Sequence, residues 1–366
     1  MRLSLIKGGN FRNFQSFEVS PDPYINIIFG ENGSGKTSFL EAVYLFGFGR
    51  SFRAGGYKTL VNNSADSFTL FATGAEDNDR SSGKYGLSRS ITGELQLRIN
   101  GQAAVRISDL VQQFPLQLFT PDSVDVITSG PSVRRQLIDW GVFHVEPQFF
   151  SAWSSYNKLL RHRNKLLKIS KGKPRPTEDR FWIEQLVSYG DKINQLRANY
   201  LLMLDKYLTP TAKTFLADVT LDISLKQGWD KDKSLSDALK GSVTNDYKYG
   251  HTTVGPHKAD LSIYANGHVA KEYLSRGQMK VVVASFKLAQ ARLLKEKTGK
   301  QCIFVVDDLT SELDEHNQKI FCSLLEESQH QIFLSSVNVD TLIENFTKKP
   351  AMFHVEHGIL KRHIEN

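Results

Sequence analysis

Hydrophobic and polar positions alternate in short runs near the N-terminus of the chain. This pattern predicts half-buried strands over 2–6 and 17–19 and a fully buried strand over 24–29. A Gly-rich loop and a predicted helix over 37–46 follow. Residues 55–120 are broken into short apolar runs by Gly, Asn, Asp and Ser, which predicts antiparallel strands and hairpins.

Residues 131–210 show helical periodicity instead. Apolar spacing predicts helices over 132–140 and 146–168, and a three-four repeat predicts a long helix over 178–207. The Lys-, Gly- and Pro-rich stretch 171–176 predicts an exposed turn between the last two. Such a pair indicates an antiparallel helical arm, and periodicity leaves an ordinary helical subdomain open as the alternative.

Mixed patterns return after residue 211. They predict strands over 219–225, 260–265, 302–306 and 331–335 and helices over 277–297 and 315–327. The chain is thus expected to have an α/β fold in three parts: residues 1–130, a basic helical insertion at 131–210, and residues 211–366.

Composition narrows the class of protein. The chain lacks the run of about eighteen apolar residues that a membrane span needs, and its first residues do not resemble a signal peptide. Two cysteines among 366 residues make no disulfide framework, so a cytoplasmic protein is expected. The net charge is +7, and residues 151–180 alone carry nine Lys or Arg against two acidic residues. Clustered cations favour DNA as a partner, with a solvated surface as the plain alternative.

The sequence Gly-Glu-Asn-Gly-Ser-Gly-Lys-Thr at 30–37 matches the phosphate-binding loop G-x-x-x-x-G-K-[ST], between a predicted strand and a predicted helix. Glycines let the loop wrap so that backbone N–H groups face phosphate oxygens. Lys36 can reach the β- and γ-phosphates of ATP, and the Thr37 hydroxyl can bind Mg²⁺. The predicted nucleotide contacts are Gly30, Glu31, Asn32, Gly33, Ser34, Gly35, Lys36, Thr37 and Ser38, of which Lys36 is also predicted to be catalytic.

Two acidic residues follow the predicted buried strand 302–306. A carboxylate at the carboxyl tip of such a strand can lie beside the phosphate loop. Asp307 is therefore predicted to hold Mg²⁺ together with Thr37, and Asp308 to act as the base that polarises the attacking water.

Two further segments resemble motifs of the ABC ATPases. Leu-Ser-Arg-Gly-Gln at 274–278 resembles the signature Leu-Ser-Gly-Gly-Gln, and Ser-Glu-Leu-Asp at 311–314 resembles the D-loop. The resemblance implies that Ser275 and Gly277 bind the γ-phosphate held by a second copy, and it adds Gln278 and Asp314 to the nucleotide contacts. Ser275 is also expected to cap the following helix, and the two roles are compatible.

The whole chain resembles the bacterial RecF family. The matching segments are 11–14, 49–53, 119–122, 129–135 and 253–261, in addition to the ATPase motifs. The resemblance implies an ABC-type ATPase head of the SMC kind with a shortened helical arm, ATP-dependent homodimers, slow ATP hydrolysis, and binding to duplex DNA and single-strand/double-strand junctions. It also implies work with RecR and RecO to load RecA in recombinational repair, replication restart and the SOS response. Arg12 and Asn13 resemble residues that touch nucleotide in related heads, and a surface position in a loop is the alternative for this pair.

The ABC pattern is incomplete after the strand 331–335. The usual His is missing, so sensing of the γ-phosphate falls to Ser336 or is absent, and His330 is expected at the surface. Gln117 lies near the place of the Q-loop but alternates with leucines, so it equally fits an outward-facing strand residue. His257 fits a structural role in a turn better than that of a catalytic base.

The predicted helix 146–168 is amphipathic and basic. Its leucines are expected to pack on the second arm helix, and its cations to face outward and contact DNA phosphates. These predicted DNA contacts are Lys158, Arg161, Arg163, Lys165 and Lys168. Since few aromatic residues are interleaved, phosphate contact with steep salt dependence is expected rather than base stacking.

Two other functions fit part of the sequence. An energy-coupling ATPase subunit of a membrane transporter would share the ATPase motifs, but the basic helical insertion argues against it. A GTPase or small-molecule kinase would leave the signature unexplained, and the guanine motif Asn-Lys-x-Asp is absent from the sequence.

Overall fold

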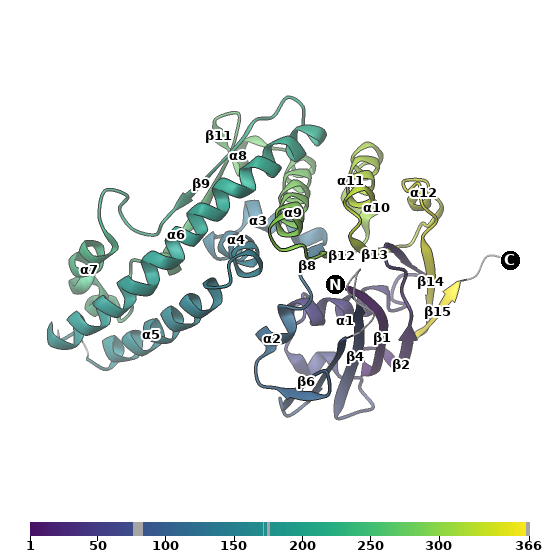
Figure 1. The fold of residues 1–366 in the computed structure, drawn as a ribbon, viewed down its shortest axis with the longest axis horizontal. Coiled ribbons are helices and arrows are strands. Elements are labelled where there is room, and N and C mark those ends of the chain that lie inside the picture. Colours follow the sequence, from purple (N-terminus) through teal and green to yellow (C-terminus); the bar gives the residue numbers. More distant parts are fainter. Residues whose placement is uncertain (76–82, 171, 174–175, 364–366) are drawn as a thin grey trace. The chain divides into compact units, whose positions relative to one another are not determined.

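The computed structural model describes residues 1–75, 83–170, 172–173 and 176–363. They form two compact units, which we call the head unit (residues 1–123 and 280–366) and the arm unit (residues 124–279) (Figure 1). Of the predicted turn at 171–176, residues 171, 174 and 175 lie outside the described part, while Gly172 and Lys173 are exposed. Across the described residues, no helix combines the length and apolar character that crossing a bilayer requires.

A largely parallel sheet forms the centre of the head unit. Its strand order is β15-β14-β3-β13-β12-β8, and only β15 runs antiparallel to its neighbour. The strands are β3 (Ile25–Phe29), β8 (Leu116–Phe119), β12 (Ile303–Val306), β13 (Gln331–Ser336), β14 (Ala351–Glu356) and β15 (Ile359–His363). Every residue of β12 and β13 is buried, which explains the apolar runs at 303–306 and 332–334.

A second, antiparallel sheet of the head unit has the order β2-β1-β4-β5-β6-β7. Its strands are β1 (Arg2–Phe11), β2 (Phe14–Val19), β4 (Ser67–Ala75), β5 (Gly83–Ser90), β6 (Leu95–Ile99) and β7 (Gln102–Ala104). Helix α1 (Lys36–Phe48) lies between the two sheets and is buried on nearly all sides. The ring of Phe39 on α1 packs against Phe17 of one sheet and Phe333 of the other. The phosphate loop that precedes α1 is therefore anchored on a rigid core.

Short helices complete the head unit around the ends of its strands. They are η1 (Tyr57–Leu60), α2 (Ile107–Val111), α10 (Leu309–Glu312), α11 (Glu315–Ser328) and α12 (Asp340–Ile343). Two further elements, η2 (Pro121–Val124) and α9 (Arg276–Thr298), span the boundaries between the units.

The arm unit is mainly helical. Its helices are α3 (Asp125–Thr128), α4 (Pro131–Val145), α5 (Phe149–Ile169), α6 (Pro176–Phe215), α7 (Leu235–Tyr249), η3 (Pro256–Lys258) and α8 (Ala270–Tyr273). An antiparallel sheet in the order β11-β10-β9 joins them, with strands β9 (Leu221–Lys226), β10 (Asp260–Ala265) and β11 (His268–Val269).

Helices α5 and α6 form the predicted antiparallel pair. Arg163 of α5 lies near Asp179 of α6, and the ring of the preceding residue, His162, lies near that of Trp182, three residues further along α6. Helix α6 continues beyond this pair and packs on α4, α7 and β9 (Figure 1). Both interpretations of the sequence, a helical hairpin and a helical subdomain, thus describe part of the arm unit.

Candidate functional site

The phosphate loop at residues 30–35 joins β3 to α1. Gly30, Gly33 and Gly35 have φ values of +147°, +81° and +126°, which side chains rarely tolerate. The ammonium of Lys36 donates to the carbonyl oxygens of Gly30 at 2.8 Å and Glu31 at 2.9 Å. Burial lowers the pKa of Lys36, and the nearby carboxylates of Asp308 and Asp307 oppose that shift. Lys36 is therefore held over the loop by carbonyls that a phosphate can replace.

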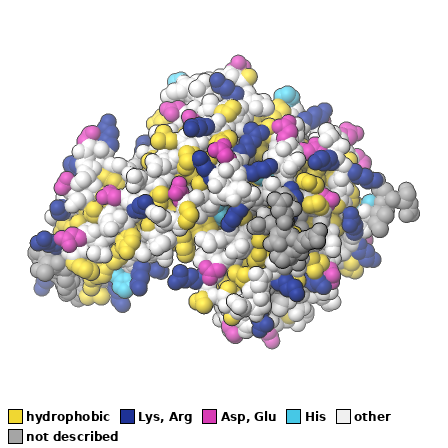
Figure 2. Space-filling model, viewed as in Figure 1, with side chains coloured by type: hydrophobic (Ala, Val, Ile, Leu, Met, Phe, Trp, Pro, Cys, Tyr) yellow, Lys and Arg dark blue, Asp and Glu magenta, His cyan; other side chains and the backbone are white. Residues whose placement is uncertain are grey.

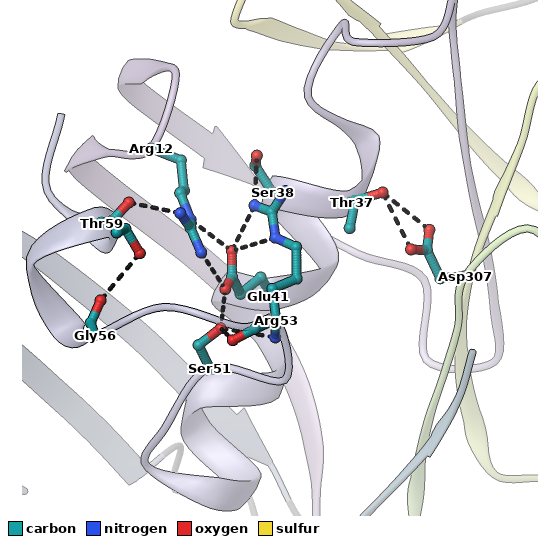
Figure 3. Close-up of polar contacts among 9 residues, drawn as sticks. All are labelled: Arg12, Thr37, Ser38, Glu41, Ser51, Arg53, Gly56, Thr59 and Asp307. Carbon is teal, nitrogen blue, oxygen red and sulfur yellow. Dashed lines mark hydrogen bonds and ion pairs between the residues drawn. The ribbon is translucent and has the colours of Figure 1, made fainter. Parts of the chain in front are cut away.

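The two aspartates predicted to act on nucleotide lie beside this loop. The Thr37 hydroxyl is 3.1 and 3.2 Å from the two carboxylate oxygens of Asp307 (Figure 3). Asp307, Asp308, Lys36 and Thr37 line one cavity of about 370 Å³. A hydroxyl and a carboxylate are the hard oxygen ligands that Mg²⁺ prefers, so the residues present fit this ion.

Asp308 has an unusual backbone and well-defined partners. Its φ and ψ of 53° and 58° are left-handed, a region in which a non-Gly residue is strained. Its carboxylate accepts hydrogen bonds from the hydroxyls of Thr310 at 3.1 Å and Ser311 at 2.5 Å. The predicted base is thus fixed by the start of the D-loop.

Ser335 is a site residue that the sequence analysis missed. Its buried hydroxyl donates to Oδ1 of Asp307 at 2.5 Å and accepts the backbone N–H of Asp308 at 3.0 Å. The sequence left two alternatives for γ-phosphate sensing, Ser336 or no residue. Ser336 donates to the carbonyl of Asn338 and does not line the nucleotide cavity, so nothing here favours the first alternative. The pairing of β12 with β13 explains the contact of Ser335 with Asp307. Val306 pairs with Leu334, so the residues that follow them, Asp307 and Ser335, lie side by side.

A buried carboxylate, Glu41, links α1 to two arginines. Arg12 and Arg53 each bind it through two nitrogens, at 2.7–2.8 Å and 2.6–3.2 Å, and Ser51 also donates to it (Figure 3). Burial would raise the pKa of Glu41, but the hydrogen bonds from Arg12, Arg53 and Ser51 outweigh it and lower the pKa below its ordinary value. Arg53 also lines the nucleotide cavity and lies 3.2 Å from the Ser38 hydroxyl. The contact of Arg12 with nucleotide stays a prediction, since Glu41 engages its guanidinium here.

The signature segment begins α9. Ser275 and Gln278 form a reciprocal cap, in which the Ser275 hydroxyl accepts the N–H of Gln278 and the Gln278 side chain accepts the N–H of Ser275. Ser275 and Gly277 are exposed, and a Cβ added at Gly277 would meet no atom within 4 Å. Asp314 caps α11 through the N–H of Asn317, and this hydrogen bond lowers its pKa.

The basic helix α5 has two faces. Lys158, Arg161, Lys165 and Lys168 are exposed, and Figure 2 shows Lys and Arg side chains along the edge of the arm unit where α5 runs. The prediction of an outward-facing Arg163 is wrong. Its side chain is 1% exposed and binds Asp246 of α7 at 2.7 Å, because that face of α5 packs on α7.

Two further polar residues, Gln117 and His257, are bonded to other parts of the fold. Gln117 is buried on β8 and donates to Gln290 of α9, so it does not line the nucleotide cavity. His257 contacts the Tyr156 hydroxyl and the Thr252 carbonyl, and burial lowers its pKa to about 4, which agrees with the expected structural role.

The expectation for His330 is wrong. It is 1% exposed, its ring stacks on Phe304, and Nδ1 lies 2.9 Å from the side-chain oxygen of Gln301. Burial lowers the pKa of His330 to about 3, with the cations of Lys295 and Arg2 acting in the same direction. The residue is a neutral part of the core.

Comparisons with known proteins agree with this geometry. The RecF/RecN/SMC N-terminal domain model matches residues 2–361. The chain is 47% identical to the DNA replication and repair protein RecF of Idiomarina loihiensis, over 98% of the chain and 99% of that protein, and 38% identical to RecF of Shewanella baltica, over 98% of both.

Solved structures give the same result. A RecF–ATP structure of the RecFOR pathway is 27% identical, covers 99% of the chain and 98% of its own, and has a TM-score of 0.89. An SMC head bound to a ScpA domain shares the fold at 14% identity and a TM-score of 0.63, over 99% of this chain and 97% of that one. The predicted fold class, an α/β ABC-type ATPase head of the SMC kind with an inserted helical arm, is confirmed, and the chain belongs to the RecF family.

Proposed function

We propose that this protein is an ATP-dependent DNA-binding switch of recombinational repair. ATP closes a dimer of two copies on duplex DNA, and slow hydrolysis releases it. The names of its relatives, DNA replication and repair protein RecF, support the process, and the pathway name RecFOR supports RecR and RecO as partners. Loading of RecA at gaps and junctions, with roles in replication restart and the SOS response, completes the proposal.

The observation that carries the proposal is the contact between Thr37 and Asp307. It joins the phosphate loop to the carboxyl end of β12, from segments 270 residues apart in the chain. A solved RecF structure contains ATP, which supports ATP as the nucleotide. Thr37 and Asp307 would hold Mg²⁺, which neutralises charge on the β- and γ-phosphates when bound.

Slow hydrolysis is consistent with the surroundings of Asp308. To act as the base, its carboxylate must orient a water while it accepts hydrogen bonds from the hydroxyls of Thr310 and Ser311. The oxygens that would orient the water are thus already engaged by two hydroxyls of the same loop. The protein then keeps ATP long enough for the bound state to act as a signal.

The cap at the start of α9 supports contact with a second copy. Ser275 and Gly277 are exposed at a helix N-terminus, where backbone N–H groups favour an anion. The open space at Gly277 leaves room for a phosphate brought by another molecule. The exposed cations of α5 supply the charge for DNA phosphates.

The test compares wild type with Ser275→Arg. Sedimentation measures dimerisation with and without ATP, and titrations at several salt concentrations measure duplex binding. We expect the variant to bind ATP like wild type and to remain monomeric, because a bulky cation occupies the place of the second copy's γ-phosphate. The matched control is Ser234→Arg, which alters the serine cap of α7 in the same unit. A Ser275→Arg protein that dimerises normally with ATP would refute the switch.

A further inference from the structure

The carbonyl oxygen of Ser34, within the phosphate loop, is held by two hairpin turns from opposite ends of the chain. The turn between β1 and β2 contributes Asn13, whose Nδ2 donates to this oxygen at 2.9 Å. The turn between β14 and β15 contributes Gly358, whose backbone N–H donates to it at 3.3 Å. These contacts connect the N-terminal and C-terminal hairpins to the same atom.

The three turns meet with almost no room for side chains. A Cβ on Gly358 would lie 2.5 Å from the Asn13 carbonyl oxygen, and one on Gly35 would lie 2.6 Å from Asn13 Nδ2. A Cβ on Gly30 would lie 2.2 Å from the carbonyl oxygen of Val355, on β14. The C-terminal hairpin therefore packs directly on the backbone of the phosphate loop.

The shape of the C-terminal turn is defined by its sequence. Glu356 pairs with Ile359, so His357 and Gly358 form a two-residue turn, and their φ values are +46° and +75°. Positive φ at both positions is the mark of a type I′ turn, which fits the twist of a hairpin. This turn presents the N–H of Gly358 to Ser34.

Holding one carbonyl has a direct consequence for phosphate binding. In a trans peptide the C=O of Ser34 and the N–H of Gly35 point in opposite directions. Two donors on the Ser34 oxygen thus keep this carbonyl turned outward and orient the N–H of Gly35, a residue that lines the cavity. A carbonyl turned toward a phosphate would repel it, while inward N–H groups attract it.

We infer that Asn13 and Gly358 are positioning residues for the nucleotide, so that the C-terminal hairpin β14–β15 is part of the nucleotide site. They act through the Ser34 carbonyl and the loop amides. This gives Asn13 a role different from the direct nucleotide contact that the family resemblance implies. The inference rests on the proposed binding of ATP and deepens it.

The test compares nucleotide affinity in Asn13→Asp and Gly358→Ala. The first replaces a donor by an acceptor of the same shape facing Ser34, and the second forces a methyl group against Asn13. We expect ATP and ADP to bind about tenfold more weakly, the loss expected from about one hydrogen bond to the loop. KM should rise accordingly, while kcat at saturating ATP changes by less than about threefold, because Asp308 is untouched.

A second turn of the same shape provides a control, because a substitution there strains the backbone without touching the phosphate loop. Asn100 and Gly101 form the same two-residue turn, with φ values of 53° and 82°, and a Cβ at Gly101 would meet no atom within 4 Å. Gly101→Ala has the same backbone cost as Gly358→Ala and should keep wild-type affinity.

The outcomes are distinguishable. Thermal unfolding without nucleotide shows whether each variant is folded. If Gly358→Ala does not fold, the affinity of Asn13→Asp for ATP and ADP is the test, because Asn13 is exposed and its substitution should not disturb the core. Folded Asn13→Asp with wild-type affinity for ATP and ADP would overturn the inference alone. A wild-type chain that binds no ATP would overturn the proposed function, and the inference with it.

Discussion

At the scale of single residues, one buried hydroxyl forms hydrogen bonds with both aspartates of the site. Ser335 donates to Asp307 and accepts the N–H of Asp308, whose left-handed backbone is strained by about 1–2 kcal/mol. Strain of this kind persists only where neighbouring contacts hold it. Ser335 is one of those contacts, and it connects the predicted metal ligand to the predicted base.

Replacing Ser335 by Ala should separate chemistry from binding. Loss of the hydroxyl removes the shorter of the two contacts that hold the Asp307 carboxylate, the other being Thr37, and removes the partner of the Asp308 N–H. We expect kcat for ATP hydrolysis to fall about tenfold, the effect of about one hydrogen bond, and the Mg²⁺ concentration for half-maximal rate to rise. ATP affinity without Mg²⁺ should stay within about twofold. Ser336→Ala, which removes a hydroxyl bound to Asn338, is the control, and equal kcat in both variants would refute the role of Ser335.

At the scale of elements, helix α5 combines two uses of arginine two residues apart. Arg161 is exposed, and Arg163 is buried between α5 and α7, where it binds Asp246 and the hydroxyl of Thr252 at 2.7 Å each. A buried charge must be paired, so Arg163 ties the two helices together. An exposed cation such as Arg161 is solvated by water and does not need an acidic partner, so it can bind a DNA phosphate.

Alanine substitutions of these two arginines should therefore have different effects, one on DNA binding and the other on stability. Arg161→Ala should leave stability unchanged and reduce the salt slope of duplex binding by about one, because one phosphate contact is lost. Arg163→Ala should cost about 3 kcal/mol of unfolding free energy, because Asp246 is left buried and unpaired. Chemical denaturation and binding at several salt concentrations measure both. A stable Arg163→Ala protein with the larger loss of DNA binding would contradict this assignment.

The same helix shows what the sequence can predict. Strands β3, β12 and β13 of the parallel sheet and helices α1, α5, α9 and α11 were predicted to within a few residues, because buried runs and helical periods are local signals. Strands β14 and β15 were not predicted, and β8 pairs in parallel although its region was predicted to be antiparallel. Helix α7 was missed, since its buried face includes the polar Ser242 and Asp246. The buried charge of Asp246 is paired with Arg163, 83 residues away in the chain. The phosphate loop and paired aspartates were likewise visible as motifs, but Ser335 and Gly358 act through neighbours remote in sequence.

At the scale of the whole molecule, the proposed switch depends on residues spread over the full chain. The phosphate loop and the C-terminal hairpin meet in the head unit, while the exposed cap of α9 and the cations of α5 lie in the arm unit. A ligand that favours one dimeric state must bind that state more tightly. If ATP and duplex DNA both favour the closed dimer, their affinities are linked.

Such linkage is reciprocal, and this gives the last prediction. If saturating ATP tightens duplex binding by some factor, saturating duplex must tighten ATP binding by the same factor, with about 5- to 150-fold as the usual range. Two titrations at one protein concentration measure the two factors, with Asp308→Asn used to slow hydrolysis during the experiment. In Asp308→Asn combined with Ser275→Arg, both factors should fall to one while ATP still binds, because the second copy can no longer complete the site. Two factors of one in Asp308→Asn alone would mean that nucleotide and DNA bind independently, and the chain would then be an ATPase and a DNA-binding protein without being a switch.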